Sequence, residues 1–328
     1  MTRHDQAGHG DVALAGNALD LEVSALRRLT PDVLELELVD PDGRDLPAWE
    51  AGAHVDVELG NGMIRQYSLC GDPAHRASYR IAVLREPNGR GGSEYLHDTV
   101  RTGSRVRAVG LRNTFELADP SARSVLVAGG IGVTPILSMV QALRARDTGW
   151  VLHYGGRSRE NMTFAEELAG LGGDVHLYPQ DEVGLLPLAE IVEQARTDDV
   201  SIYACGPAPM LDLLRSLTDH AGGVELHLER FTGASVITPT TGFTVHLTRS
   251  RLSMDVAPDS SLLDVLEEHG IDILSSCRSG VCGTCEVKVV SGTPDHRDDI
   301  LNDAERAEGQ VMMPCVSRAT SNHLTLDL

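Results

Sequence analysis

Short stretches in which apolar and polar residues alternate occupy the first third of the chain. Residues 33–39 alternate apolar and acidic positions, and residues 55–59 alternate again before a glycine-rich turn at 60–62. Residues 79–84 predict a further strand. A period of two is typical of strands that bury one face. Regularly spaced short strands of this kind predict an antiparallel barrel.

The pattern changes near residue 120. The continuous apolar run 124–128 predicts a strand buried on both faces, and further strands are predicted at 150–154, 175–178 and 200–204. Helical patterns lie between them, at residues 135–143, 164–168 and 210–215. Strands that alternate with helices imply a parallel sheet covered on both sides.

A third segment follows a stretch rich in threonine, glycine and proline. Residues 243–247 and 252–256 predict a hairpin, and residues 261–270 predict an amphipathic helix with Ser261 as its N-cap and Gly270 just past its end. We therefore expect a flexible N-terminal tail, two domains, a linker and a third domain, at residues 1–17, 18–118, 119–232, 233–241 and 242–328.

The charge of the chain narrows the possible partners. Among 328 residues, 28 are Lys or Arg and 48 are Asp or Glu, so the formal net charge is −20. This excess argues against binding to nucleic acid or to an anionic membrane surface. No stretch reaches the roughly 20 apolar residues of a membrane span, and the polar residues 1–6 do not form a signal-peptide pattern. We expect a cytoplasmic protein.

Four of the six cysteines gather near the C-terminal end. The spacing Cys277-x4-Cys282-x2-Cys285, followed later by Cys315, is that of a plant-type [2Fe–2S] site. Gly280 would let the backbone bend closely around a small cluster. A structural zinc is the main alternative, although the second Cys-x2-Cys pair that zinc sites usually have is missing. Disulfides are a further alternative.

Two glycine-containing segments follow predicted strands of the parallel sheet. Residues 129–132 join a strand to a helix, so their amides could face a pyrophosphate, although Pro135 stands where the usual dinucleotide fingerprint has Gly or Ala. Tight packing alone would also explain these glycines. Cys205 ends another strand, where open sheets bind ligands, and a buried core cysteine is the alternative.

The predicted barrel carries a second candidate phosphate loop. Residues 90–93, Arg-Gly-Gly-Ser, follow a strand and precede a helix, so their amides and hydroxyl could bind a phosphate. Alternation along a strand places Arg65 and Tyr67 on one face, which suits a flat ring with a phosphate tail. A bare turn and an ordinary cross-strand patch are the alternatives.

The order of these motifs resembles one family, the phthalate dioxygenase reductases, whose relatives include vanillate O-demethylase reductases. The resemblance covers residues 19–328. It implies a multidomain protein with an antiparallel β-barrel flavin domain of the ferredoxin-reductase type, an α/β parallel-sheet NAD-binding domain and an α+β, β-grasp ferredoxin-like domain. It also implies FMN, NADH and a [2Fe–2S] cluster as cofactors.

The resemblance assigns roles to single residues. It makes Thr134 and Cys205 the candidate catalytic residues beside the nicotinamide, and it places Phe231 over the flavin. It implies that the flavin is bound by Arg65, Gln66, Tyr67, Ser68, Ala82, Val83, Leu84, Arg90, Gly91, Gly92 and Ser93. It implies that the dinucleotide is bound by Gly129, Gly130, Gly132, Thr134, Arg157, Ser158, Cys205, Gly206 and Pro207. The implied iron ligands are Cys277, Cys282, Cys285 and Cys315.

These cofactors form a logical relay. A nicotinamide gives up two electrons as hydride, a [2Fe–2S] cluster accepts one electron, and a flavin can mediate between them. The chain has no Rieske-type Cys-x-His pairs, so we expect it to pass electrons to a separate terminal oxygenase. We also expect the protein to be a monomer. A Rieske-type enzyme is the first candidate and a cytochrome P450 the second. A redox sensor and a free-standing flavin reductase are alternative functions, and NADPH is left open by Arg157 and Arg159.

Overall fold

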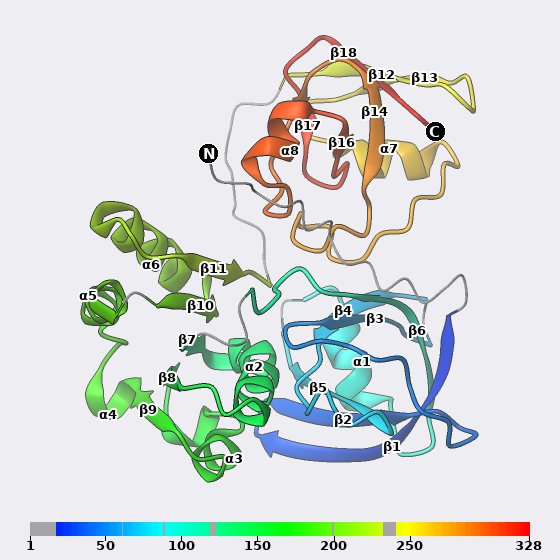
Figure 1. Cartoon of the computed structure of the whole chain (residues 1–328). Helices are drawn as coiled ribbons and strands as arrows, with labels where there is room; N and C mark the ends of the chain where they lie inside the picture. The colour runs from blue at the N-terminus through cyan, green and yellow to red at the C-terminus, as the bar shows by residue number, and fades with distance from the viewer. Residues whose placement is uncertain (1–17, 61, 88, 119–122, 199, 232–240) are drawn as a thin grey trace. The chain divides into compact units, whose positions relative to one another are not determined.

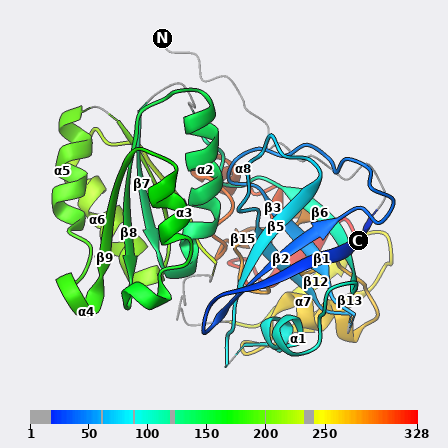
Figure 2. The same cartoon turned by 90° about the horizontal axis from the view of Figure 1, so that it is seen from below.

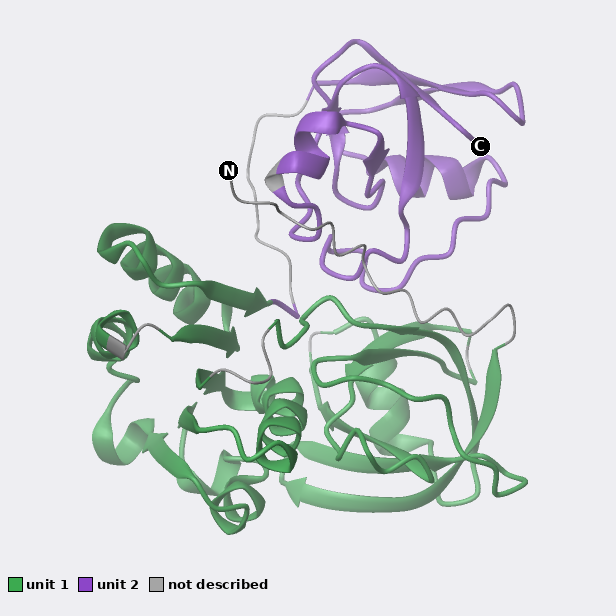
Figure 3. Cartoon of the chain, viewed as in Figure 1, with its two compact units in different colours: residues 1–229 green, residues 230–328 purple. Residues whose placement is uncertain are grey.

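The computed structural model describes residues 18–60, 62–87, 89–118, 123–198, 200–231 and 241–328. The chain divides into two compact units, residues 1–229 and 230–328 (Figure 3). The tail predicted at 1–17 lies outside the described residues, and so does the predicted linker apart from residue 241. Among the helices of the described ranges, none is both long and apolar enough to cross a membrane.

Six antiparallel strands and one helix build the first half of the larger unit (Figure 1). The strands are hydrogen-bonded in the order β4-β3-β6-β1-β2-β5, and an antiparallel bridge between Leu69 and Ile81 closes the sheet into the predicted barrel. The elements are β1 Leu19–Thr30, β2 Val33–Val39, β3 His54–Glu58, β4 Ile64–Ser68, β5 Ser78–Leu84, α1 Gly92–Asp98 and β6 Arg105–Arg112.

Strand β2 departs from the alternation that its sequence predicts. Glu35 stands at a position expected to face solvent, yet it is only 3% exposed. Burial of a carboxylate is costly unless it is paired. Arg80 of the neighbouring strand β5 and Arg27 of β1 both form ion pairs with Glu35, which explains how the carboxylate is accommodated.

Five parallel strands form the second half of the larger unit. Their order is β11-β10-β7-β8-β9, and all six residues of the central strand β7 are buried, as the apolar run predicted. The strands are β7 Ser124–Gly129, β8 Trp150–Gly156, β9 Asp174–Pro179, β10 Ser201–Cys205 and β11 Leu226–Glu229. The helices are η1 Gly130–Gly132, α2 Val133–Ala145, η2 Arg159–Asn161, α3 Ala165–Gly170, α4 Gln180–Val183, α5 Leu188–Asp198 and α6 Ala208–Ala221.

Helices cover both faces of this sheet. Figure 2 shows α2 and α3 on one side of β7–β9, with α5 and α6 on the other. On the α2 side, buried residues of the barrel such as Ala51 and Phe115 join the same core as Ile136 and Leu152. The barrel and the α/β half therefore share an apolar interface, while the barrel also keeps a core of its own.

The second unit contains a five-stranded mixed sheet and a short two-stranded ladder. The predicted hairpin is confirmed, and the helix that follows begins after Ser261, whose hydroxyl accepts a hydrogen bond from the Asp264 amide. Leu262 and Leu266 of this helix lie in the core of the unit. The elements are β12 Phe243–Leu247, β13 Ser253–Val256, α7 Leu262–Glu268, β14 Val287–Ser291, β15 Pro294–Asp295, α8 Asp303–Glu308, β16 Val311–Met312, β17 Arg318–Ala319 and β18 His323–Leu326.

Candidate functional site

The structure brings the four C-terminal cysteines together. Cys277 hydrogen-bonds with Cys282 and with Cys315, and Cys285 hydrogen-bonds with Cys315. Three of the four are buried and Cys277 is half-buried. The thiols of Cys282 and Cys315 donate to Cys277 and so lower its pKa, which favours the thiolate that binds metals.

The loop that carries three of these cysteines is bent tightly. Gly280 has a φ of +75°, and a Cβ there would lie 2.6 Å from Val316 Cγ2, so only glycine fits. The backbone N–H of Ser279 donates to Cys277 Sγ at 3.3 Å. Arg278 anchors the loop to α7 through Asp264, at 2.8 Å. The loop therefore turns its amides and its thiols inward.

This donor set fits a [2Fe–2S] cluster. Among the described residues, no three His, Cys, Asp or Glu side chains are placed to hold one metal ion. The four thiols instead form one connected series of contacts, Cys282–Cys277–Cys315–Cys285, and a [2Fe–2S] cluster takes four thiolate ligands. All six cysteines are free thiols.

The two loops at the carboxyl ends of β7 and β10 contact each other closely. A Cβ on Gly132 would lie 2.3 Å from Cys205 O, and a Cβ on Gly129 would lie 2.6 Å from Pro207 Cδ. Gly130 has a φ of +54° and open space where its Cβ would be. The predicted glycine loop and the predicted Cys205 loop thus form one edge, and the position of a Cβ on Gly130 at this edge is unobstructed.

Both candidate catalytic residues lie at this edge and both are buried. Thr134 is 2% exposed and its hydroxyl donates to Ile131 O at 3.0 Å. Cys205 is fully buried, and burial together with the neighbouring Glu229 raises the pKa of its thiol. Burial also raises the pKa of Glu229 to about 8. Glu229 belongs to no sequence motif, and its only signal is its place at the end of the strand beside Cys205.

The carboxyl end of β8 carries the residues predicted for the adenosine side. Arg157 is exposed, and Ser158 accepts a hydrogen bond from Asn161 at 2.8 Å. Arg159 forms a two-point ion pair with Glu182, at 3.2 and 2.8 Å. Glu182, which no sequence motif marks, thus pairs with one of the two arginines on which the NADPH alternative rests.

The barrel brings the predicted flavin residues together in part. Arg65 Nη2 donates to Arg90 O at 2.9 Å, and a Cβ on Gly92 would lie 2.5 Å from Arg65 Nε. Strand β4 and the 90–93 turn are therefore neighbours. Burial raises the pKa of the Tyr67 hydroxyl, and Gln66 Nε2 lies 3.4 Å from Asp56 Oδ1. The remaining predicted residues of β4 and β5 are buried or half-buried: Ser68, Ala82 and Val83 are buried, and Leu84 is half-buried.

The predicted flavin residues Ser93 and Phe231 belong to different units. Ser93 lies in the first turn of α1, which begins at Gly92, and its hydroxyl accepts a hydrogen bond from the Glu86 amide at 3.0 Å. Phe231, predicted to cover the flavin, has an exposed ring near the start of the second unit.

Comparisons with known proteins agree with these sites. Residues 126–216 match the family described as "Oxidoreductase NAD-binding domain", and residues 245–320 match "2Fe-2S iron-sulfur cluster binding domain". The phenoxybenzoate dioxygenase subunit beta of Ectopseudomonas oleovorans is 42% identical, covering 94% of this chain and 97% of its own. The vanillate O-demethylase oxidoreductase of Pseudomonas sp. is 39% identical, covering 94% of this chain and 100% of its own.

Solved structures give the same result. Phthalate dioxygenase reductase, described as modular for electron transfer from pyridine nucleotides to [2Fe–2S], is 38% identical with a TM-score of 0.70, covering 95% of this chain and 98% of its own. An intact type IV self-sufficient cytochrome P450 monooxygenase is 39% identical with a TM-score of 0.85, and the match spans 99% of this chain but 43% of that one. The chain belongs to the phthalate dioxygenase reductase family of NAD-dependent, iron–sulfur electron-transfer oxidoreductases.

Proposed function

We propose that this protein is the reductase component of a Rieske-type aromatic oxygenase or O-demethylase system. Electrons pass from NADH through FMN to the [2Fe–2S] cluster and then to a separate oxygenase. The observation that carries the proposal is the convergence of four thiols in the second unit. In the larger unit, two glycine-containing loops also meet at one edge of the parallel sheet. The relatives named for a dioxygenase and for an O-demethylase support the choice of acceptor.

The proposed roles follow the predicted site residues. Cys277, Cys282, Cys285 and Cys315 hold the cluster, while Thr134 and Cys205 line the nicotinamide. A flavin supplies the change from two-electron to one-electron transfer when it is bound. Arg65 fixes the turn at 90–93 against β4, and Arg90 of this turn is exposed and would contribute its positive charge to binding the phosphate tail.

The proposed domain limits are 18–118 for the flavin domain, 119–232 for the nucleotide domain and 242–328 for the ferredoxin-like domain. The two family matches fall inside the second and third ranges. The barrel strands β1–β6 fall inside the first range.

The net charge of the chain bears on how the protein would associate with its oxygenase. A net charge of −20 favours a partner with a basic docking face, and association should then slow as salt is raised. A cytochrome P450 is the alternative acceptor, because almost the whole chain aligns with part of a self-sufficient P450 monooxygenase. Turnover of the purified reductase with each class of oxygenase distinguishes the two.

A Cys282→Ser variant tests the proposed order of the relay. The wild-type protein should reduce both cytochrome c and a two-electron dye at the expense of NADH. The variant should lose cytochrome c reduction and keep dye reduction, because the dye can take electrons directly from the flavin. Cys70→Ser is the matched control, since Cys70 is a buried cysteine of the barrel and serine can still donate to Arg80 O. Loss of neither activity in Cys282→Ser would show that the relay order is wrong.

A further inference from the structure

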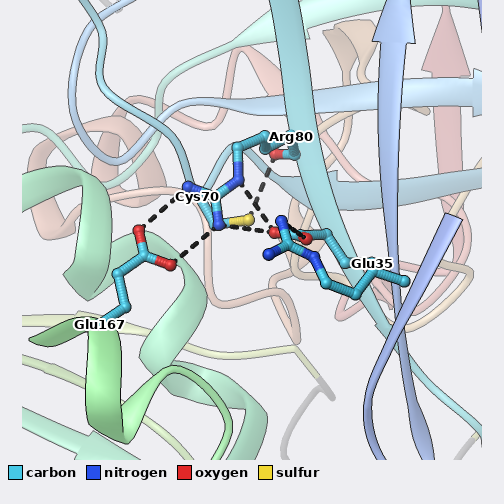
Figure 4. Close-up of polar contacts among 5 residues, drawn as sticks. Glu35, Cys70, Arg80 and Glu167 are labelled. Carbon is cyan, nitrogen blue, oxygen red and sulfur yellow. Dashed lines mark hydrogen bonds and ion pairs between the residues drawn. The ribbon is translucent and has the colours of Figure 1, made fainter. Parts of the chain in front are cut away.

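Arg80 lies at the boundary between the barrel and the α/β half of the larger unit. Figure 4 shows its guanidinium between two carboxylates, Glu35 of the barrel and Glu167 of α3. It donates to Glu167 Oε1 and Oε2, both at 3.0 Å, and to Glu35 Oε1 at 2.9 and 2.6 Å. A planar guanidinium suits this two-point recognition in a way that a lysine ammonium does not.

The Arg80 backbone is held as firmly as its side chain. Its carbonyl accepts hydrogen bonds from the Cys70 amide at 2.9 Å and from the Cys70 thiol at 3.3 Å. Burial raises the pKa of Cys70 to about 12, so the thiol keeps its proton as a donor. Arg80 precedes Ala82 and Val83 on β5, the strand proposed to run along the flavin ring. The position of its guanidinium is therefore fixed relative to that strand.

The segment of the α/β half that Arg80 contacts is strained. Phe164 lies under the guanidinium, with 5.4 Å between the guanidinium carbon and the ring centroid. Its φ of +62° is in the left-handed region, which is uncommon for a bulky aromatic residue. Such strain persists only where surrounding contacts impose it. The contacts of Arg80 with Phe164 and Glu167 are contacts of this kind.

This segment is connected to the loop proposed to bind the dinucleotide. The Tyr154 hydroxyl donates its one proton in a shared hydrogen bond to two carbonyls, Thr163 O at 3.1 Å and Gly130 O at 3.2 Å. Tyr154 is fully buried, so these bonds are shielded from water. A continuous chain of contacts thus runs from β5 through Arg80, Phe164 and Tyr154 to Gly130.

We propose that Arg80 is a positioning residue that sets the placement of the nicotinamide-binding loop relative to the flavin-binding strand. The proposal rests on the proposed function, since it concerns the NADH-to-flavin step. Arg80 acts through Glu167 and the 163–164 segment, and it touches neither cofactor. Its loss should misplace the hydride donor relative to its acceptor and leave cluster chemistry unchanged.

Glu167→Gln is the principal test, because Glu167 is partly exposed on a helix and the substitution keeps its size. Arg80→Lys is the second variant. Arg196→Lys is the matched control, because Arg196 makes a similar fork with Glu193 inside α5. Each holoprotein is mixed anaerobically with NADH, and the flavin reduction rate and the long-wavelength nicotinamide–flavin absorbance are recorded. Hydrogen exchange of the backbone amides at 162–168 is measured in the same proteins.

We expect Glu167→Gln and Arg80→Lys to reduce the flavin about tenfold more slowly, with a weaker long-wavelength band, because small misplacements of reacting groups are costly. The concentration of NADH that gives half the maximal rate should change less than the rate itself. The amides at 162–168 should exchange faster in both variants, and Arg196→Lys should match the wild type in every measurement.

Two failures are distinguishable. If the wild-type flavin is not reduced by NADH, the proposed function fails. If the wild type is reduced and folded Glu167→Gln matches it in rate and in absorbance, Arg80 has no positioning role. A lower melting temperature with an unchanged rate also overturns the proposal, since it shows a purely structural contact. Should Arg80→Lys fail to fold, Glu167→Gln alone decides.

Discussion

Gly132 offers a direct test of the edge formed by the loops after β7 and β10. In Gly132→Ala, the added Cβ would lie 2.3 Å from Cys205 O and 2.5 Å from Cys205 C. Both atoms belong to the backbone, so neither can rotate away. Relief to an ordinary contact requires the two loops to separate by about 1 Å, and a displacement of this size can cost about 100-fold in rate. Overpacking should also lower the free energy of unfolding by about 2 kcal/mol.

Steady-state turnover of NADH with a dye acceptor measures the effect. We expect kcat/KM for NADH to fall by about 100-fold in Gly132→Ala while the bound flavin and iron are retained. Gly170→Ala is the control, since its Cβ would meet open space and its φ is not left-handed. A folded Gly132→Ala protein with wild-type kcat/KM would refute the reasoning, because the closely packed edge would then have no part in binding the dinucleotide.

Three further predictions concern other parts of the chain. Burial lowers the pKa of His153 from 6.5 to about 4. Between pH 6.5 and pH 4 the unfolded chain therefore binds a proton at this residue that the folded protein does not bind. The free energy of unfolding consequently decreases as the pH falls through this range. Urea unfolding at pH 7 and at pH 4.5 measures how far the free energy of unfolding decreases with acid. This decrease should be about 2 kcal/mol smaller in His153→Gln than in the wild type, and equal decreases would contradict the prediction. Glu182→Gln should release Arg159 from its ion pair and raise the ratio of kcat/KM for NADPH to kcat/KM for NADH severalfold. An unchanged ratio would show that the Arg159–Glu182 pair has no part in the choice of coenzyme. Asn302→Ala should lower the free energy of unfolding by about 1 kcal/mol through loss of the capping box of α8, and an unchanged melting temperature would count against the cap.

The sequence was most informative where one local pattern determines one structure. The apolar run of β7 is typical of a strand buried on both faces, and the Ser261 cap marks the start of α7. The four-cysteine spacing was equally restrictive, because few local folds can gather thiols at those intervals. The antiparallel barrel and the parallel sheet were both predicted from hydrophobic period.

Contacts between distant segments were beyond such reasoning. Glu35 lies in an alternating strand, and its three-dimensional pairing with Arg80 and Arg27 explains its burial. No local pattern marks Glu229 or Glu182, because each contacts a residue distant in the sequence: Glu229 of β11 lies beside Cys205 of β10, and Glu182 of α4 pairs with Arg159 of η2. The helix α5 also escaped notice, although its charged outer face and apolar inner face are ordinary features of a helix that covers a sheet.

Anaerobic titration with NADH tests the relay most directly. A bound flavin stores two electrons and the cluster one, so full reduction of both should require about 1.5 equivalents of NADH per chain. The absorbance of both centres should bleach over that range. Completion at one equivalent, with the cluster still oxidised, would contradict the claim that electrons from NADH reach the four-cysteine centre.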